Sequence, residues 1–461
     1  MDRQTLTQLP VSHRADIVVC GAGVAGAFAA IAAAREGMDV LLVEQFGMAG
    51  GSATAGLVTP VMHSGIEGDP ACSYLSAELR DRLRIAGGCD ESGRSFDPML
   101  LKIVLEQMLA DAGVRLLYYT FVPDAIVEEG RVTSAVIANK EGLSRIEGRM
   151  FIDCTGDGDL CVRAGAGFRK GNPKTGVNQP MSLRYVVDGV DTLALRTLFE
   201  EVKARTGVDR CADVSEDGLY VYADCCKAKP VTLTPVFEKA VADGDLIPED
   251  HFYWQAFSIE GRRGSIAFNC PEFFEHIDGT SVRDLTLAQI NGKRAIMRQM
   301  AFYRKCLRGF EHAWVSEIAP MVGVRESREI DTDYVLTAED LFLKRKFDDM
   351  FCQSNYPIDV HGEMLSNTLL DKVTDDGKPW YEIPYRCLTV KGFDNLMVAG
   401  RCLGAEFAAE ASVRVQQSAR SSGEAAGIGA AMALRQGVAP REIDGAEIRA
   451  RMVALGAKYA Q

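Results

Sequence analysis

The chain of 461 residues lacks the patterns that mark several protein classes. Its 13 cysteines include no Cys-x-x-Cys spacing, so neither a zinc ribbon nor a cysteine-ligated iron–sulfur run is visible, and we expect no metal site. Lys and Arg number 51 against 64 Asp and Glu, and the net charge of −13 argues against a nucleic-acid partner. Most cysteines stand in apolar stretches, as reduced thiols do, which favours a cytoplasmic location.

One apolar run resembles a membrane segment. Ile17–Ala34 spans 18 residues without a charge, which is the lower margin for a membrane span. A cluster of glycine and alanine interrupts the run, which reads as a strand, a turn and an Ala-rich helix ending at Gly37. The β-branched character returns at Val40–Val43, so the segment predicts a βαβ unit whose strands are buried on both faces. We therefore expect no membrane partner.

A glycine-rich loop follows the first of these strands. Gly21, Gly23 and Gly26 fit Gly-x-Gly-x-x-Gly, whose glycines make a tight turn, let a pyrophosphate approach the backbone and allow close helix packing. The free N–H groups at the start of the helix attract phosphates. Glu44 stands 18 residues after Gly26, at the end of the second strand, where a carboxylate accepts hydrogen bonds from ribose hydroxyls. The pattern predicts a dinucleotide site that repels the 2′-phosphate of NADP.

Three later segments favour FAD over NAD as the dinucleotide. A second glycine-rich loop, Gly47–Thr54, suits a cofactor whose second half lies along the chain. Asp153–Asp159 follows another predicted strand, and Val398–Arg401 closes a strand ahead of a small-residue helix expected over Val413–Leu434. The sequence has neither a second Gly-x-Gly-x-x-Gly nor a paired redox cysteine motif, which disfavours a disulfide reductase of this fold.

Together these segments resemble the FAD-dependent oxidoreductases of the glutathione-reductase-type fold, a branch distantly similar to the tRNA-uridine-modifying flavoproteins. The resemblance covers roughly the first 170 and the last 75 residues and implies non-covalently bound FAD. Many flavoproteins of this fold place Asp after the last glycine, where this chain has Arg401. The positions assigned to cofactor binding are Gly21, Gly23, Ala25, Gly26, Glu44, Gln45, Gly50, Gly51, Ser52, Val122 (after a strand expected over Val114–Phe121), Thr155, Gly156, Gly400, Arg401, Arg414 and Val415.

The predicted fold is α/β, with a discontinuous domain and an inserted one. The Rossmann-like FAD-binding domain is expected over residues 1–168 and 384–461, and a mixed α+β substrate or cap domain over 169–383. The middle segment is richer in aromatic and charged residues and predicts a long amphipathic helix over Val282–Arg308. Because doubly wound sheets bind ligands at the carboxyl ends of their strands, the flavin is expected between the two domains.

The catalytic candidates are selected by their positions along the chain relative to these motifs. His63 follows the second glycine loop and could take a proton near the flavin, although a structural histidine explains it as well. Arg325, in a segment that resembles the family's Gly-x-Arg-x-x-Arg, could clamp a carboxylate or phosphate, or join an ion-pair network with neighbouring acids. Cys402 follows the turn at Gly400 and could contact the flavin. Weaker candidates of the same kind are His361, Tyr385 and Arg386.

The expected activity is hydride transfer between flavin N5 and an unidentified small organic substrate, as in a dehydrogenase or reductase. The alternatives left open are an NAD-dependent dehydrogenase and a flavoprotein subunit of an electron-transfer or RNA-modifying complex. The net charge of −13 counts against the RNA-modifying alternative. A homo-oligomer or an electron-transfer partner also stays open.

Overall fold

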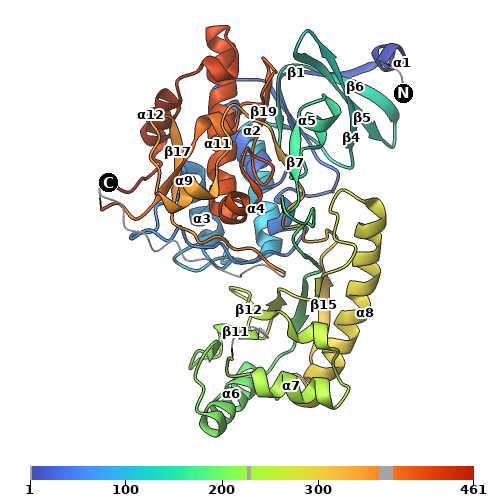
Figure 1. Cartoon of the computed structure of the whole chain (residues 1–461), viewed down its shortest axis with the longest axis vertical. Coiled ribbons are helices and arrows are strands. Elements are labelled where there is room, and N and C mark those ends of the chain that lie inside the picture. The colour runs from blue at the N-terminus through green and yellow to red at the C-terminus, as the bar shows by residue number, and fades with distance from the viewer. Residues whose placement is uncertain (1–2, 226–229, 363–376) are drawn as a thin grey trace.

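The computed structural model of the chain describes residues 3–225, 230–362 and 377–461 and shows two lobes (Figure 1). The upper lobe in this view holds both chain termini, the strands β1 and β6, and the helices α2 and α11. The lower lobe holds β11, β12, β15 and the helices α6, α7 and α8. The chain therefore leaves the first lobe, builds the second and returns.

The first lobe is built on a mixed sheet in the order β3-β2-β1-β6-β5-β4, with β19 paired to β6. One part of the sheet is parallel and contains β3, β2, β1, β6 and β19. The strands β5 and β4 extend it beyond β6 with antiparallel pairing. This arrangement confirms the predicted βαβ unit and the α/β class. The bounds are β1 Val11–Cys20, β2 Val40–Val43, β3 Arg115–Leu117, β4 Phe121–Glu128, β5 Arg131–Asn139, β6 Gly142–Asp153 and β19 Leu396–Val398.

Two helices of small residues cover one face of this sheet. α2 (Val24–Arg35) and α11 (Gln416–Gln436) are buried along most of their lengths. A Cβ at Gly423 would lie 2.0 Å from the Ala25 carbonyl oxygen, and one at Gly427 would lie 2.2 Å from that of Ala29. The two backbones can approach this closely only because glycine stands at the contact. The C-terminal segment thereby becomes part of the N-terminal nucleotide-binding unit.

The second lobe is an antiparallel sheet in the order β10-β11-β12-β13-β9-β15, which we call the cap sheet. Its core is aromatic: Tyr185 stacks on Phe268 at 4.9 Å between ring centroids, and Phe268 on Tyr303 at 5.1 Å. The elements are β9 Tyr185–Asp188, β10 Ala212–Val214, β11 Val221–Cys225, β12 Trp254–Ser258, β13 Ile266–Phe268, β15 Trp314–Ile318, α6 Thr192–Thr206, α7 Thr234–Ala242 and α8 Val282–Cys306.

Shorter elements surround these two sheets. The 3₁₀ helices are Gly51–Ala53, Pro248–His251, Tyr385–Cys387 and Pro440–Glu442. The remaining elements are α1 Arg3–Thr7, α3 Tyr74–Ile85, α4 Pro98–Asp111, α5 Asp159–Arg163, β7 Phe168–Lys170, β8 Met181–Ser182, β14 Glu272–Phe273, β16 Arg328–Ile330, α9 Ala338–Phe342, β17 Met350–Ser354, β18 Tyr381–Pro384, α10 Phe407–Val413 and α12 Gly445–Leu455. Within the described parts of the chain, no helix has the length and apolar character that a membrane span requires.

Three boundaries differ from the sequence-based expectations. The helix expected over Val413–Leu434 begins only at Gln416, because Val415 has an extended backbone (ψ 150°) that separates α10 from α11. The strand expected over Val114–Phe121 shortens to β3, so Val122 lies at the start of β4. Buried residues from Leu336 to Val360 pack in the core of the first lobe, so the chain re-enters that lobe well before the expected limit at residue 384.

Candidate cofactor and substrate site

A large cavity of about 1640 Å³ lies at the carboxyl ends of the parallel strands. One part of its wall comes from the loops after β1, β2, β6 and β19, and the other comes from the cap sheet, including Tyr222 and Phe257. Small-molecule pockets usually measure about 300–1,000 Å³, so this volume suits a cofactor together with a substrate. Of the residues assigned to FAD from the sequence, all but Gly26 and Gly50 line it.

The three glycines of the first loop have different structural roles. A Cβ at Gly21, where φ is +94°, would lie 2.4 Å from the Cys154 carbonyl oxygen, and one at Gly26 would lie 1.8 Å from that of Gly21. At these two positions the neighbouring backbone leaves no room for a side chain. A Cβ at Gly23 would meet no atom within 4 Å, because it would enter the cavity at the start of α2. The space beside Gly23 and the free N–H groups of the helix start fit a pyrophosphate.

Glu44 lies at the end of β2 with its carboxylate held in place. The amide N–H groups of Ala22 and Phe46 donate to its two oxygens at 2.7 and 2.9 Å. Burial raises the pKa of this carboxyl, and the backbone donors partly offset that effect. Glu44 and the adjacent Gln45 both line the cavity, where carboxylate lone pairs can accept from a ribose.

The second glycine loop is fastened to the first. The Gly50 N–H donates to the Ala22 carbonyl at 2.7 Å, and Gly50 forms an isolated parallel bridge with Gly23. Gly50 therefore anchors the loop, whereas Gly51 and Ser52 line the cavity. The two loops together form one continuous wall for an extended dinucleotide.

The ends of β6 and β19 carry a polar network that explains the departure at Arg401. Asp153 accepts from the Thr155 N–H at 3.0 Å and from its hydroxyl at 2.7 Å, which fixes the turn after β6. Arg401 forms an ion pair of 2.7 Å with Asp157 and donates to Ser327 at 2.9 Å. The guanidinium thus links the β19 end to the β6 loop instead of offering the carboxylate that other flavoproteins have there.

The loop between α10 and α11 brings Arg414 to the cavity. Its Nη2 donates to the Asp359 carbonyl at 3.0 Å and lies 3.5 Å from the Asp359 carboxylate. Val415, also predicted as a cofactor residue, caps α11 and lines the cavity. The break in the predicted helix is therefore what places both residues at the site.

A charged cluster faces the cavity on the cap side. Arg325 Nη2 lies 2.5 Å from Glu272 Oε1, and His361 Nδ1 lies 2.9 Å from the same oxygen. His361 Nε2 lies 3.5 Å from Asp359 Oδ1. Burial raises the pKa of Glu272, but the charge of Arg325 and the contact with His361 outweigh burial and lower it. Of these four residues the sequence indicated Arg325 and His361, whereas no motif marked Glu272 or Asp359.

The other catalytic candidates lie away from the cavity wall. His63 is exposed, with its ring 6.1 Å from that of Tyr356, and the wall includes its neighbour Met62 instead. Cys402 is buried in the core behind β6, and burial raises the pKa of its thiol far above the ordinary value. Tyr385 donates to the Pro440 carbonyl, and Arg386 pairs with Asp349 at 2.9 Å. The structure therefore brings Arg325 and His361 to the site, and not these four residues.

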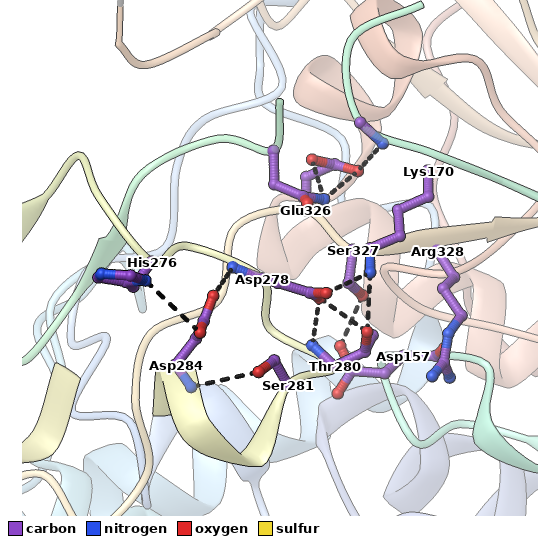
Figure 2. A network of polar contacts seen from close by, with 12 residues as sticks. Asp157, Lys170, His276, Asp278, Thr280, Ser281, Asp284, Glu326, Ser327 and Arg328 are labelled. Carbon is purple, nitrogen blue, oxygen red and sulfur yellow. Dashed lines mark hydrogen bonds and ion pairs between the residues drawn. The ribbon is translucent and has the colours of Figure 1, made fainter. Parts of the chain in front are cut away.

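Polar contacts fix the segment that precedes α8, as Figure 2 shows. Lys170 donates to Asp278 at 2.7 Å and to the Thr280 hydroxyl at 2.8 Å. The Asp278 N–H donates to Asp284, and the Ser281 hydroxyl caps the start of α8 by accepting from the Asp284 N–H. Because Gly279 and the first turns of α8 line the cavity, this network positions one of its walls.

One buried carboxylate joins the two chain segments that connect the lobes. Glu326 accepts from the Gly171 N–H at 2.8 Å, from the Asn178 amide at 2.9 Å and from the Gln179 N–H at 3.2 Å. The first connection runs over 171–180 and the second contains Glu326 itself. The outgoing and returning segments are therefore held side by side.

The comparisons with known proteins agree with this geometry. Residues 16–452 match the family model described as FAD dependent oxidoreductase. The chain belongs to this family of FAD-dependent oxidoreductases. Its cofactor is FAD, and the resemblance inferred from the sequence is confirmed. The empty volume beside Gly23, the held carboxylate of Glu44 and the two joined glycine loops fit that cofactor.

Individual relatives are distant. The digeranylgeranylglycerophospholipid reductase 2 of Methanopyrus kandleri is 29% identical over 153 residues, which are 31% of this chain and 37% of that protein. A p-nitrophenol 4-monooxygenase from Pseudomonas putida is 10% identical, with a TM-score of 0.48 over 96% of this oxidoreductase and 87% of that chain. A geranylgeranyl bacteriochlorophyll reductase-like protein from Thermoplasma acidophilum is 12% identical, with a TM-score of 0.44 over 96% and 83%.

Proposed function

We propose that this oxidoreductase is a dehydrogenase or reductase of a small organic molecule that binds in the cap half of the cavity. The observation that carries the proposal is the continuity of the cavity, which joins the cofactor loops to the cluster of Glu272, Arg325 and His361. Bound FAD supplies hydride transfer at its N5 atom. The protein has to position the substrate, exclude water and move the accompanying proton.

The walls of the cap half favour a partly apolar substrate. Phe252, Phe257 and Phe274 line it, and Gln255 and Asn269 add amide groups between them. Apolar walls with a few polar groups exclude water and orient a small molecule. The Asn269 amide donates to the Tyr253 hydroxyl at 2.8 Å, so part of this polar set is already ordered.

His361 is the group we assign to proton transfer. Its Nδ1 lies 2.9 Å from Glu272, which holds the tautomer that carries the proton on Nδ1. In that tautomer Nε2 carries no proton and can accept one from a substrate hydroxyl or amine. Asp359, 3.5 Å from Nε2, stabilises the imidazolium that results. This arrangement replaces His63 as the expected base.

The test is an anaerobic screen of small alcohols, amines and acids for bleaching of the flavin absorbance, followed by rapid-mixing kinetics on the best reductant. His361→Gln should slow flavin reduction about 10²- to 10⁴-fold while flavin content stays unchanged. His312→Gln, at an exposed position outside the cavity wall, is the matched control and should reduce at the wild-type rate.

Two results would contradict the proposal. Reduction of His361→Gln at the wild-type rate would remove His361 from proton transfer. Incorporation of labelled dioxygen into the product in the presence of a reductant would show a monooxygenase instead of a dehydrogenase. The comparisons give no support to the NAD-dependent or RNA-modifying alternatives.

A further inference from the structure

Three arginines converge in the cap half of the cavity, and two of them have a carboxylate partner. Arg325 pairs with Glu272 at 2.5 Å. Arg414 contacts both the backbone carbonyl and the side-chain carboxylate of Asp359. The third is Arg184, which lines the same cavity immediately before β9. Across residues 3–225, 230–362 and 377–461, its guanidinium makes no hydrogen bond or ion pair.

The surroundings of Arg184 disfavour an uncompensated cation. Arg184 is a partly buried residue that directly precedes β9 of the cap sheet. Burial lowers the pKa of Arg184 to about 10, and the charges of Arg325 and Arg414 act in the same direction, while Tyr253 opposes them. A partly buried charge without a partner is costly, and a bound anion would supply the missing partner.

The other acid of the cap half does not fill this role. Asp224, on β11, lines the cavity, and its negative charge acts on Tyr253. Neither Asp224 nor any other carboxylate of the described residues comes within ion-pair distance of Arg184. Glu272 and Asp359 are already engaged by Arg325, His361 and Arg414.

We propose that Arg184 binds a carboxylate of the substrate, and that the substrate is a monocarboxylate with an apolar or aromatic body. The planar guanidinium matches a carboxylate with two parallel N–H donors. The aromatic side chains of Tyr222, Phe252 and Phe257 form an adjoining wall that would cover the apolar body. The inference rests on the proposed placement of the substrate in the cap half, and it names the chemical class.

The experiment measures ligand binding to the oxidised holoenzyme, without turnover. Benzoate and hexanoate are titrated by calorimetry and by the change in the flavin visible spectrum, and each is compared with its neutral amide. The wild-type protein should bind at least one carboxylate 10-fold or more tightly than the matching amide. Arg184→Gln should weaken that carboxylate about 10- to 100-fold, the loss expected for charged hydrogen bonds, and leave the amide unchanged.

Two variants serve as controls. Arg294→Gln removes the same charge from an exposed position on α8 and should bind the carboxylate as the wild type does. Arg184→Lys keeps the charge without the fork and should recover part of the affinity. Flavin content and melting temperature verify that each variant is folded, and the comparison of acid with amide in the wild type tests the proposal without any variant.

Several outcomes would overturn the inference. One is equal binding of acids and amides by the wild type, and another is unchanged carboxylate affinity in Arg184→Gln. A lower flavin reduction potential in Arg184→Gln with normal carboxylate binding would assign this arginine to the cofactor instead. Because binding is measured without turnover, carboxylate binding without any hydride transfer would contradict only the proposed dehydrogenase activity.

Discussion

Replacing Gly23 with alanine should separate cofactor binding from folding. Gly23 has φ −59° and ψ 179°, which alanine adopts without strain, and its added Cβ would meet no protein atom within 4 Å. The apo-protein should therefore keep its stability to within about 1 kcal/mol. The same change at Gly26 would place Cβ 1.8 Å from the Gly21 carbonyl oxygen and should disrupt the packing of α2.

The effect of Gly23→Ala on FAD follows from the open helix start. A methyl group at this position occupies the space through which a phosphate approaches the first N–H groups of α2. Loss of two hydrogen bonds to a charged group costs about 1.5–3 kcal/mol each, or about 3–6 kcal/mol together. FAD affinity should then fall about 10²- to 10⁴-fold.

The assay is titration of the apo-protein with FAD, followed by flavin fluorescence, together with thermal unfolding of the same samples. Gly23→Ala should melt like the wild-type apo-protein and bind FAD poorly, whereas Gly26→Ala should melt lower or fail to fold. Wild-type FAD affinity in Gly23→Ala would refute the placement of the phosphates at this loop. A melting temperature far below that of the wild-type apo-protein would refute the conclusion that a side chain at position 23 meets no protein atom.

Three further predictions concern buried charges. Glu44→Gln should weaken FAD about 10- to 100-fold in the same titration and destabilise the apo-protein by about 1–3 kcal/mol, because the Gln NH2 group cannot accept from one of the two backbone N–H groups; unchanged affinity would mean that the ribose is held elsewhere. Arg325→Met should lower the free energy of unfolding in urea by about 3 kcal/mol, because it leaves Glu272 buried with only His361 beside it. The double variant with Glu272→Leu should recover at least half of the lost stability. Full stability of the single variant would contradict this pairing. Burial raises the pKa of Glu410 from its ordinary value of 4.5 to about 8. The folded state thus holds this proton more tightly than the unfolded state, and the resulting stability is complete below about pH 4 and is lost as the pH rises to 8. The melting temperature of Glu410→Gln should fall less over pH 5–8 than that of the wild type, and parallel curves would contradict the raised pKa.

The cofactor half of the site could be predicted from the sequence because its signals are local. The Gly21–Gly26 loop, Glu44 and the Gly50–Ser52 loop each stand next to a strand end, and strand ends of a parallel sheet meet at one edge. The packing of α11 on α2 also follows from small residues that the sequence displays. The start of α11 could not be predicted, because neither glycine nor proline marks the extended backbone at Val415.

The sequence contains no comparable local signal for the cap half of the cavity. Arg184 precedes a strand of the cap sheet, Glu272 lies on the separate strand β14, and His361 follows a segment packed in the first lobe, so only the packing of the two lobes brings them together. No fixed spacing relates these residues, so single-sequence reasoning cannot pair them. The short distance along the chain from the second glycine loop to His63 predicts a place near the flavin, but the backbone puts His63 outside the cavity wall.

The carboxylate of Glu326 has a consequence for how this enzyme can be redesigned. It joins the outgoing segment at Gly171 to the returning one, so both chain connections to the cap sheet meet at this carboxylate. Elsewhere the two lobes are joined by the Arg262–Asp97 and Lys102–Glu317 ion pairs. We expect that the segment between these two connections can be exchanged for the corresponding part of a relative, provided that Glu326 with its donors and the partners of Asp97 and Lys102 are retained. Specificity would then change by transplantation while the flavin-binding lobe keeps its own sequence.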